Sequence, residues 1–330
     1  MARIGINPAR GKQTAYKPPQ VTVALLTYIP HLDGYFRHKL DVLKLSLASL
    51  AAHTSLPYDL LIFDNGSCPQ VVDFLREAQT AGRVDYLLLS RRNIGKIGAF
   101  AQIFNAAPGE LVAYADDDIF FYPGWLEKHL EIYETYPQVG MVSGSPVRNA
   151  SERSRRSLDA WMAQSPPGLT ITREHRFPDA WDRDWAASTG RDPDAYLEQI
   201  RNAQDLILCY QGVEAFGSAS HFQFLAPRDV IRQALPQSWS GFLMGKMMEL
   251  DDAVDAGGYL RLCTVERCTR HLGNTLDVGV LAEARALGVD VDAPLPLRAA
   301  QRHWLLKIPG AGRVLRALYD RLFRILNQGT

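Results

Sequence analysis

The feature that most constrains this 330-residue chain is an alternation, over residues 21–115, between short apolar runs and segments that are apolar at helical spacing. The apolar runs have the β-branched, nearly continuous character of strands buried on both faces; they are 21–28, 58–67, 84–90 and 109–115. The helical segments between them are 39–53, 71–82 and 97–107. Strands that alternate with helices predict an α/β fold with a doubly wound, mostly parallel sheet.

After a helical pattern over 125–137 and an apolar run over 139–144, the alternation stops. Residues 147–205 are rich in charge, Trp, Pro and Ser, which predicts an inserted helical and loop segment over the strand ends. Further along we expect strands over 216–227 and 259–265, and a loop and helix within 238–258.

Charge and cysteine content exclude several classes of protein. The 36 Lys and Arg balance the 36 Asp and Glu, so no global field draws the chain onto nucleic acid. Residues 1–20 are basic, contain Pro and lack the apolar core of a secretory signal, and no stretch is apolar for long enough to span a membrane. The four Cys show no CxxC spacing, which favours reduced thiols and a cytoplasmic location.

Three consecutive aspartates, Asp116, Asp117 and Asp118, follow the apolar run 109–115 directly. Neighbouring carboxylates raise one another's pKa, so this position calls for a cation. In an extended segment alternate side chains share a face, so we expect Asp116 and Asp118 to point together. Carboxylate oxygens suit Mg²⁺ or Mn²⁺, and such a cation would offset the charge of a diphosphate leaving group. The alternative is a solvated acidic turn.

Polar residues also follow the other predicted strands, where ligands bind in such sheets. Asp64 could accept from the imide N–H of a pyrimidine base or from a ribose hydroxyl, or could form an Asx turn with Asn65 before the next helix. The stretch from Asn93 to Gly98 brings glycines and Lys96 to a helix start, where backbone N–H groups and a point charge favour phosphate.

Two later features complete the predicted site. The first is an acidic cluster late in the chain, Glu249, Asp251 and Asp252. If the reaction is sugar transfer, the attacking acceptor hydroxyl must lose its proton to a positioned carboxylate, and each of the three is a candidate for that base. The alternative is acidic residues that complement a helix dipole. His271 could be a third metal ligand or a structural histidine.

The segment 298–330 contains seven Lys or Arg and one acid, Asp320, and its stretch GRVLRALYDRLFRILN is a basic amphipathic helical pattern. Such a helix can lie on an anionic membrane surface, pack on the domain, or pair with a second copy.

Taken together, VTVALLTY, FDNGS, RNIGKIGAFAQIFNAAPGE, ADDDIFFYPGWLE and a late acidic cluster followed by HLGN resemble the family 2 glycosyltransferases of the GT-A fold. The resemblance covers residues 20–145 well and 216–274 more loosely. It implies a nucleotide-sugar donor, a divalent metal (Mn²⁺ or Mg²⁺), inversion at the anomeric carbon, and often lipid-linked or surface glycan products.

By position, the resemblance assigns Asp116 and Asp118 to the family's DxD metal motif and His271 to the histidine that completes the metal site. Donor contacts are implied for the residues at the strand ends, namely Thr27, Tyr28, Asp64, Asn65, Asn93, Lys96, Asp116 and Asp117. The family's Glu-Asp pair precedes an Arg-containing helix, whereas MELDDAVDAGGY is shorter and lacks that Arg. We favour Asp251 as the base, ahead of Asp252 and Glu249.

The sequence therefore predicts a metal-dependent, inverting glycosyltransferase that moves a sugar from a UDP-, dTDP- or GDP-linked donor to a glycan or lipid-linked glycan in cell-surface polysaccharide synthesis. It would be cytoplasmic, with peripheral contact to the inner leaflet through the tail. Two alternatives stay open: a nucleotidyltransferase on a related sheet, and a non-catalytic sugar-nucleotide or glycan-binding protein.

The predicted parts of the chain follow from this assignment: an arm (1–20), a nucleotide-sugar-binding half (21–146), an inserted acceptor-side segment (147–215), an acceptor-binding and base-carrying half (216–297), and a basic tail (298–330).

Overall fold

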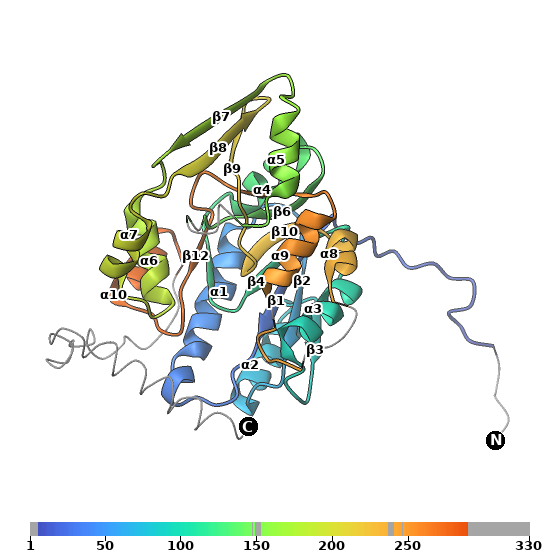
Figure 1. Cartoon of the computed structure of the whole chain (residues 1–330). Coiled ribbons are helices and arrows are strands. Elements are labelled where there is room, and N and C mark those ends of the chain that lie inside the picture. Colours follow the sequence, from blue (N-terminus) through green and yellow to red (C-terminus); the bar gives the residue numbers. More distant parts are fainter. Residues whose placement is uncertain (1–5, 147, 149–152, 237–240, 246, 290–330) are drawn as a thin grey trace, which may run out of the picture.

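A computed structural model describes residues 6–146, 148, 153–236, 241–245 and 247–289 of the protein (Figure 1). The strands are β1 (Val21–Thr27), β2 (Tyr58–Asp64), β3 (Tyr86–Leu89), β4 (Leu111–Asp116), β5 (Ile119–Phe121), β6 (Val139–Ser143), β7 (Leu169–Glu174), β8 (Asp205–Tyr210), β9 (Val213–Phe216), β10 (Gln223–Pro227), β11 (Leu260–Cys263) and β12 (Thr269–His271). The helices are η1 (Gly34–Phe36), α1 (Lys39–His53), α2 (Pro69–Thr80), α3 (Gly95–Ala106), α4 (Trp125–Thr135), α5 (Arg156–Ala163), α6 (Asp179–Ser188), α7 (Pro193–Ile200), α8 (Arg228–Ala234), α9 (Met247–Ala256) and α10 (Val278–Ala286).

A single ten-stranded sheet organises the molecule, in the order β3-β2-β1-β4-β10-β6-β11-β9-β8-β7. The pairings place seven strands in one direction, and only β10, β9 and β7 run the other way. The prediction of an α/β fold with a mostly parallel sheet is therefore confirmed. A separate ribbon pairs β5 with β12.

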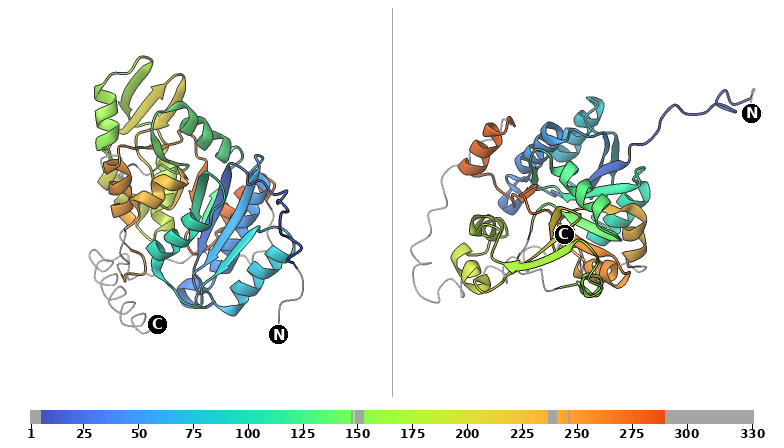
Figure 2. Two further views of the ribbon diagram at one scale, coloured as in Figure 1. Left: turned by 90° about the vertical axis from the view of Figure 1, so that its right-hand side faces the viewer. Right: turned by 90° about the horizontal axis from the view of Figure 1, so that it is seen from above.

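Helices cover both faces of the sheet, as the two rotated views show (Figure 2). One apolar core holds side chains of α3, α8 and α9 against β1, β2, β4 and β10. The opposite core holds side chains of α1, α2 and α4. These two cores bury the apolar faces that the helical spacing predicts, because each helix presents its apolar side to a sheet that is apolar on both faces.

The region after β6 departs from the expected pattern in two places. The predicted single strand over 216–227 is two strands, because β9 ends at Phe216 and β10 begins at Gln223 after a Gly- and Ser-containing loop. The segment expected to hold only helices and loops also contains β7, which pairs with β8 at the edge of the sheet. The β7 side chains are mostly exposed, so no apolar run marks this strand in the sequence.

Within this segment the guanidinium of Arg148 is fully buried. It lies 3.0 Å from Asp205 and 3.1 Å from Asp182, contacts Asp179 at 3.3 Å, and stacks on the ring of Phe177 at 4.2 Å. Burial raises the pKa of Asp182 to about 7 despite the nearby guanidinium. A buried cation that holds three carboxylates fixes α6 to the start of β8.

No helix among the described residues is long and apolar enough to cross a membrane. The predicted amphipathic helix in the tail 298–330 lies outside the described residues.

A buried polar cluster joins β6, β10 and β12 behind the strand ends. His129 on α4 is fully buried, with Nδ1 2.6 Å from the carbonyl oxygen of Trp125 and Nε2 3.3 Å from Gln223 Oε1. Gln223 Oε1 also accepts from the backbone N–H of Gly144 at 2.7 Å and from the hydroxyl of Thr269 at 3.2 Å. Burial lowers the pKa of His129 to about 4, so the ring is neutral in the folded protein.

This neutral histidine predicts an acid-sensitive fold. Because its folded pKa is lowered below the ordinary value of about 6.5, its contribution to stability is complete above that value and is lost as the pH falls toward 4. We expect His129→Gln to remove about 3 kcal/mol of the pH dependence of the free energy of unfolding between pH 7 and pH 4. Urea titrations at several pH values measure this slope. The exposed His31→Gln is the matched control, and an unchanged slope in His129→Gln would contradict the assignment.

Candidate functional site

The polar residues predicted to meet at one edge of the sheet do meet there. In the parallel pairing of β1 with its neighbours, Thr27 aligns with Asp64, and Leu26 aligns with Asp116. These are the last residues of β2 and β4, so their side chains stand at the carboxyl edge, where loops rather than further strands surround them.

Two lysines hold the three aspartates. Lys96 Nζ lies 2.6 and 2.7 Å from the two carboxylate oxygens of Asp116. Lys39 Nζ lies 2.7 Å from Asp117 and 3.0 Å from Asp118. The hydroxyl of Thr27 donates to Asp117 at 2.7 Å. The two lysines therefore supply part of the positive charge that the three aspartates require.

The expectation that Asp116 and Asp118 share a face was wrong. β4 ends at Asp116 and the next two residues form a turn, so the alternation of an extended strand stops there. As a result Asp117 and Asp118 share Lys39, whereas Asp116 turns to Lys96 and accepts from the hydroxyl of Tyr114.

The surroundings set the pKa values of the two buried acids in opposite directions. Burial raises the pKa of Asp117, against the pull of Lys39 and with the neighbouring charge of Asp118. Burial also disfavours ionised Asp118, but His271, Lys39 and Lys96 together outweigh it and lower its pKa. Asp118 is therefore the stable anion of the pair. Burial lowers and the two acids raise the pKa of Lys39, with a net increase that keeps it charged.

One carboxylate oxygen of Asp118 faces the imidazole ring of His271. Asp118 Oδ1 is buried and has no hydrogen-bond partner in the described part of the chain, and it lies 3.5 Å from His271 Nε2. The other ring nitrogen, Nδ1, lies 2.8 Å from the hydroxyl of Ser188, which orients the imidazole. An orphaned carboxylate oxygen and an imidazole nitrogen facing each other fit two ligands of a divalent cation.

The structure brings together two of the three predicted metal ligands, Asp118 and His271. No group of three or more His, Cys, Asp or Glu suited to a metal ion occurs among the residues the structure describes. Both oxygens of Asp116 lie on Lys96 instead. A cation held by Asp118 and His271 would need further oxygen ligands from substrate or water, as Mg²⁺ sites usually have.

The loops after β2 and β3 form a second wall of the site. The carboxylate of Asp64 accepts from the backbone N–H groups of Gly66 and Ser67 at 3.2–3.3 Å, which is the Asx-type turn left open as the alternative. Burial raises the pKa of Asp64 in spite of these donors. Asn65 donates to Asn93 Oδ1 at 3.0 Å and accepts from the N–H of Ile94 at 2.9 Å.

Glycine is required at one point of this wall. Gly66 has φ +93°, and a Cβ there would lie 2.9 Å from the backbone carbon of Arg92. The close approach of the two loops fixes the start of α3, and with it Lys96, beside the aspartates. Tyr28, at the other end of the wall, is half-buried and packs edge-on against Phe36 at 6.3 Å between ring centroids.

The segment 221–223 joins the aspartates to the predicted base. The carbonyl of Phe222 accepts from the backbone N–H of Asp116 at 2.9 Å, and its ring lies 5.5 Å from that of His271. One residue earlier, His221 Nδ1 lies 2.9 Å from Asp251 Oδ2. An acid 135 positions along the chain from Asp116 is thereby brought to the same edge of the sheet.

The three candidate bases differ in their surroundings. Asp251 is buried, and besides His221 it has the guanidinium of Arg261 at 3.0 Å from Oδ1, an ion pair without hydrogen-bond geometry. Asp252 is exposed and accepts from Ser154 at 2.6 Å. Glu249 lies in the first turn of α9 and is exposed. Asp251 contacts the segment 221–223 through His221.

Sequence reasoning did not find Lys39 and Arg261. Each of these residues occupies a position that is unfavourable for an unpaired cation. Lys39 is the first residue of α1, where a cation opposes the helix dipole. Arg261 interrupts the apolar strand LRLC, so it needs an acid partner once buried. Arg261 also places a guanidinium on Asp251, although α9 itself lacks the expected arginine.

The fold and site define an α/β protein with a mostly parallel sheet, at one edge of which two lysines pair with three aspartates. Residues 35–192 match the family model described as glycosyl transferase family 2. This region, a little under half of the chain, is therefore similar to glycosyltransferase family 2. An uncharacterized glycosyltransferase of Nostoc sp. (strain PCC 7120) is 27% identical over 121 residues, which are 37% of each chain. The chain thus spans little more than a third of this relative.

Solved structures give a much fainter likeness. The crystal structure of S. aureus TarS residues 1–349 is 17% identical, with a TM-score of 0.31 over 38% of this chain and 35% of that one. The same fragment in complex with UDP-GlcNAc gives a TM-score of 0.30 over 38% and 34% of the two chains. At these scores the likeness carries no conclusion about this chain.

The lysine clamp makes a testable claim about stability. Lys39→Met leaves two buried carboxylates without their cation, and we expect a loss of about 3–5 kcal/mol in the free energy of unfolding at pH 7.5. Unpaired buried carboxylates have raised pKa values, so the deficit should shrink as the pH falls and they take up protons.

Chemical denaturation at pH 7.5 and pH 5 measures both effects. Arg37→Met removes an exposed positive charge two residues earlier and serves as the control, with an expected change below about 0.5 kcal/mol. Equal stability losses in the two variants would show that the clamp is not a stabilising interaction.

Proposed function

We propose that the protein is a glycosyltransferase that moves a sugar from a nucleotide-sugar donor to a hydroxyl acceptor with inversion. The observation that carries the proposal is the convergence at residues 221–223, where Asp251 is joined through His221 to the turn of three aspartates. A buried carboxylate on one side and a cluster of lysines and aspartates on the other are the two parts that direct sugar transfer needs.

The donor would lie along the ends of β1, β2 and β4. The N-terminal turn of α3 and Lys96 supply positive potential for a diphosphate, and the Asn65–Asn93 pair holds that turn in place. Thr27, Tyr28 and Asp64 line the same edge and are proposed to contact the nucleoside. The UDP-, dTDP- and GDP-linked sugars are the candidate donors.

A divalent cation, Mn²⁺ or Mg²⁺, would be held by Asp118 and His271, and when bound it would offset the charge that develops on the diphosphate. Asp116 is proposed to contact the donor together with Lys96. We do not count it among the ligands of the cation, because both of its carboxylate oxygens lie on Lys96. Lys39 keeps Asp117 and Asp118 in place, so the Asp118 oxygen that faces His271 stays oriented.

At the acceptor side Asp251 would take the proton of the attacking hydroxyl. The acceptor oxygen forms a bond to the anomeric carbon, the bond from that carbon to the diphosphate oxygen breaks, and the acceptor proton moves to the carboxylate. His221 and Arg261 orient Asp251, as the partner of a general base does in other active sites.

The loop before α9 bears on the kind of acceptor. The side chains of Phe242, Leu243 and Met244 are more than half exposed, and the carbonyl of Leu243 accepts from the backbone N–H of Lys96 at 2.7 Å. Exposed apolar side chains this close to a polar site favour a partner with an apolar part. This supports a lipid-linked glycan acceptor at the cytoplasmic face of a membrane, in polysaccharide synthesis.

Asp251→Asn tests the catalytic assignment. We expect the rate of sugar transfer to fall by about 10²–10⁴-fold with donor affinity unchanged, because a general base acts only on the acceptor proton. Asp252→Asn removes the neighbouring exposed carboxylate and should keep most of the rate. Product analysis separates the classes: a free nucleoside diphosphate identifies a glycosyltransferase, pyrophosphate a nucleotidyltransferase, and no turnover of any donor a binding protein.

The metal assignment is tested by donor binding rather than by turnover. Calorimetry of UDP-, dTDP- and GDP-sugars should show Mn²⁺-dependent affinity in the unaltered protein. Asp118→Asn and His271→Gln should each weaken the Mn²⁺-dependent part by at least the roughly 10–100-fold that loss of supporting groups costs at metal sites. Asp251→Asn is the control with affinity retained. Mn²⁺-dependent binding that survives both changes would place the cation elsewhere.

A further inference from the structure

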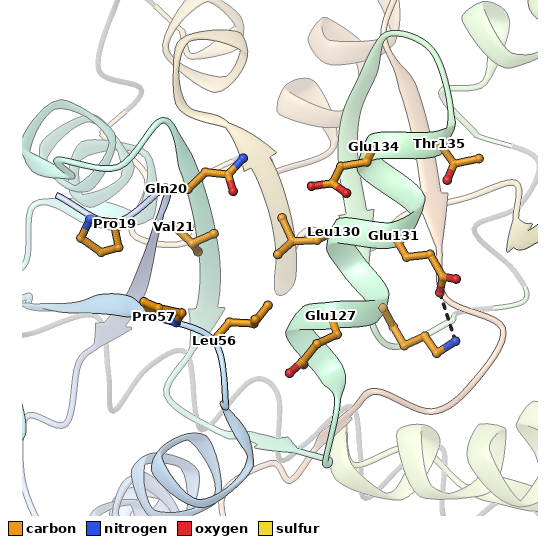
Figure 3. A pocket seen from close by; sticks show the side chains of 11 residues that line it. Pro19, Gln20, Val21, Leu56, Pro57, Glu127, Leu130, Glu131, Glu134 and Thr135 are labelled. Atoms are coloured by element: carbon orange, nitrogen blue, oxygen red, sulfur yellow. Dashed lines mark hydrogen bonds and ion pairs between the residues drawn. The ribbon is translucent and has the colours of Figure 1, made fainter.

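A groove of about 910 Å³ lies at the edge of the sheet opposite the candidate site. One wall is the start of β1 with the turn before β2, and the other is α4 (Figure 3). The apolar side chains that line it are Val21, Leu56, Pro57 and Leu130. Because β1 runs from Val21 here to Thr27 at the aspartates, the groove and the site are separated by the length of the strand.

The wall formed by α4 is acidic. Glu127, Glu131 and Glu134 follow one another at helical spacing and all line the groove. Glu127 and Glu134 point toward the opposite wall, whereas Glu131 turns toward Lys128 (Figure 3). Lys128 pairs with Glu131 at 3.1 Å, and Glu134 has no ion-pair partner among the described residues.

Glu127 carries the clearest sign of an absent partner. One of its oxygens accepts from the hydroxyl of Ser55, and the other, Oε2, is buried with no hydrogen-bond partner within the described ranges. A buried carboxylate oxygen without a donor is costly, so the groove favours a cationic partner.

The residues just past α10 contact the helix end that leads into this groove. The carbonyl of Leu287, just past α10, lies 3.0 Å from Nε2 of His53, the last residue of α1. Two residues after His53, Ser55 contacts Glu127, and the next two residues, Leu56 and Pro57, line the groove.

The following 41 residues, 290–330, include a segment of complementary chemistry. Residues 313–326 (RVLRALYDRLFRIL) are apolar at eight positions and carry four arginines and one acid. At helical spacing this sequence presents an apolar stripe bordered by positive charge.

We propose that residues 313–326 dock in this groove as an amphipathic helix. The apolar stripe would cover Leu56 and Leu130, and the arginines would meet Glu127, Glu131 and Glu134. The 23 residues between Val289 and Arg313 can span up to about 75 Å, far more than the path along the turn before β2 requires. An apolar helix face in an acid-rimmed groove is a common mode of recognition.

Amide hydrogen exchange on the full-length protein tests the docking. Docked amides in 313–326 should exchange at least tenfold more slowly than the same amides in the variant Glu131→Gln/Glu134→Gln, because docking protects them. Asp73→Asn/Glu77→Gln removes two exposed acids from α2 and is the matched control, in which protection should persist.

Three results would overturn the proposal. The first is rapid exchange of 313–326 in the unaltered protein at all concentrations. The second is protection that arises only when vesicles of anionic phospholipid are added, which would assign the segment to a membrane surface. The third is protection that rises with protein concentration together with dimer formation in sedimentation, which would assign it to a second copy.

Discussion

The arrangement of the site depends on the electrostatic requirement of three carboxylates at the end of a buried strand. Like charges in a low-dielectric setting are tolerated only with cations close by. Lys39 and Lys96 meet that need, and both lie in the first turn of a helix. The same contacts therefore bring the starts of α1 and α3 to the carboxyl edge of the sheet. The pairs that neutralise the acids therefore also determine which helix starts form this edge of the site.

The second half of the site is positioned by a strand that runs against its neighbours. β10 lies antiparallel between β4 and β6, so the residues before it reach the edge where β4 ends. If β10 ran parallel to β4, its last residues would reach this edge in place of the residues before it. A helix would then have to follow the strand directly. With β10 reversed, Phe222 touches Asp116 and His271 while His221 holds Asp251, so groups from distant parts of the sequence meet across three residues.

Much of the donor half could be predicted from the sequence, because β1, β2 and β4 are apolar on both sides and end in polar residues. The fold class and the resemblance to family 2 glycosyltransferases follow from that pattern. The orientations of the aspartates could not be predicted, since they depend on where β4 gives way to a turn. Lys39 and Arg261 were missed because a lone cation in a helix or strand acquires a role only when packing buries it against an acid. Strand β7 is exposed on nearly every side chain, and its alternation of apolar and polar residues covers only Leu169 to Thr172.

The segment between β6 and β10 has small cores of its own, one around Phe177, Ile207 and Phe216 and another around Ala186, Tyr196 and Ile200. Its internal cohesion comes from the buried Arg148 and its acids, a separate set of charges from the two lysines that hold the three aspartates. The segment meets the site where Ser188 contacts His271. Sequence change in this segment can accordingly accumulate with little effect on the strands that carry Asp116 and Asp64. Evolution could alter the outer part of this segment while the strand ends keep their arrangement, so that one sheet can carry different edges.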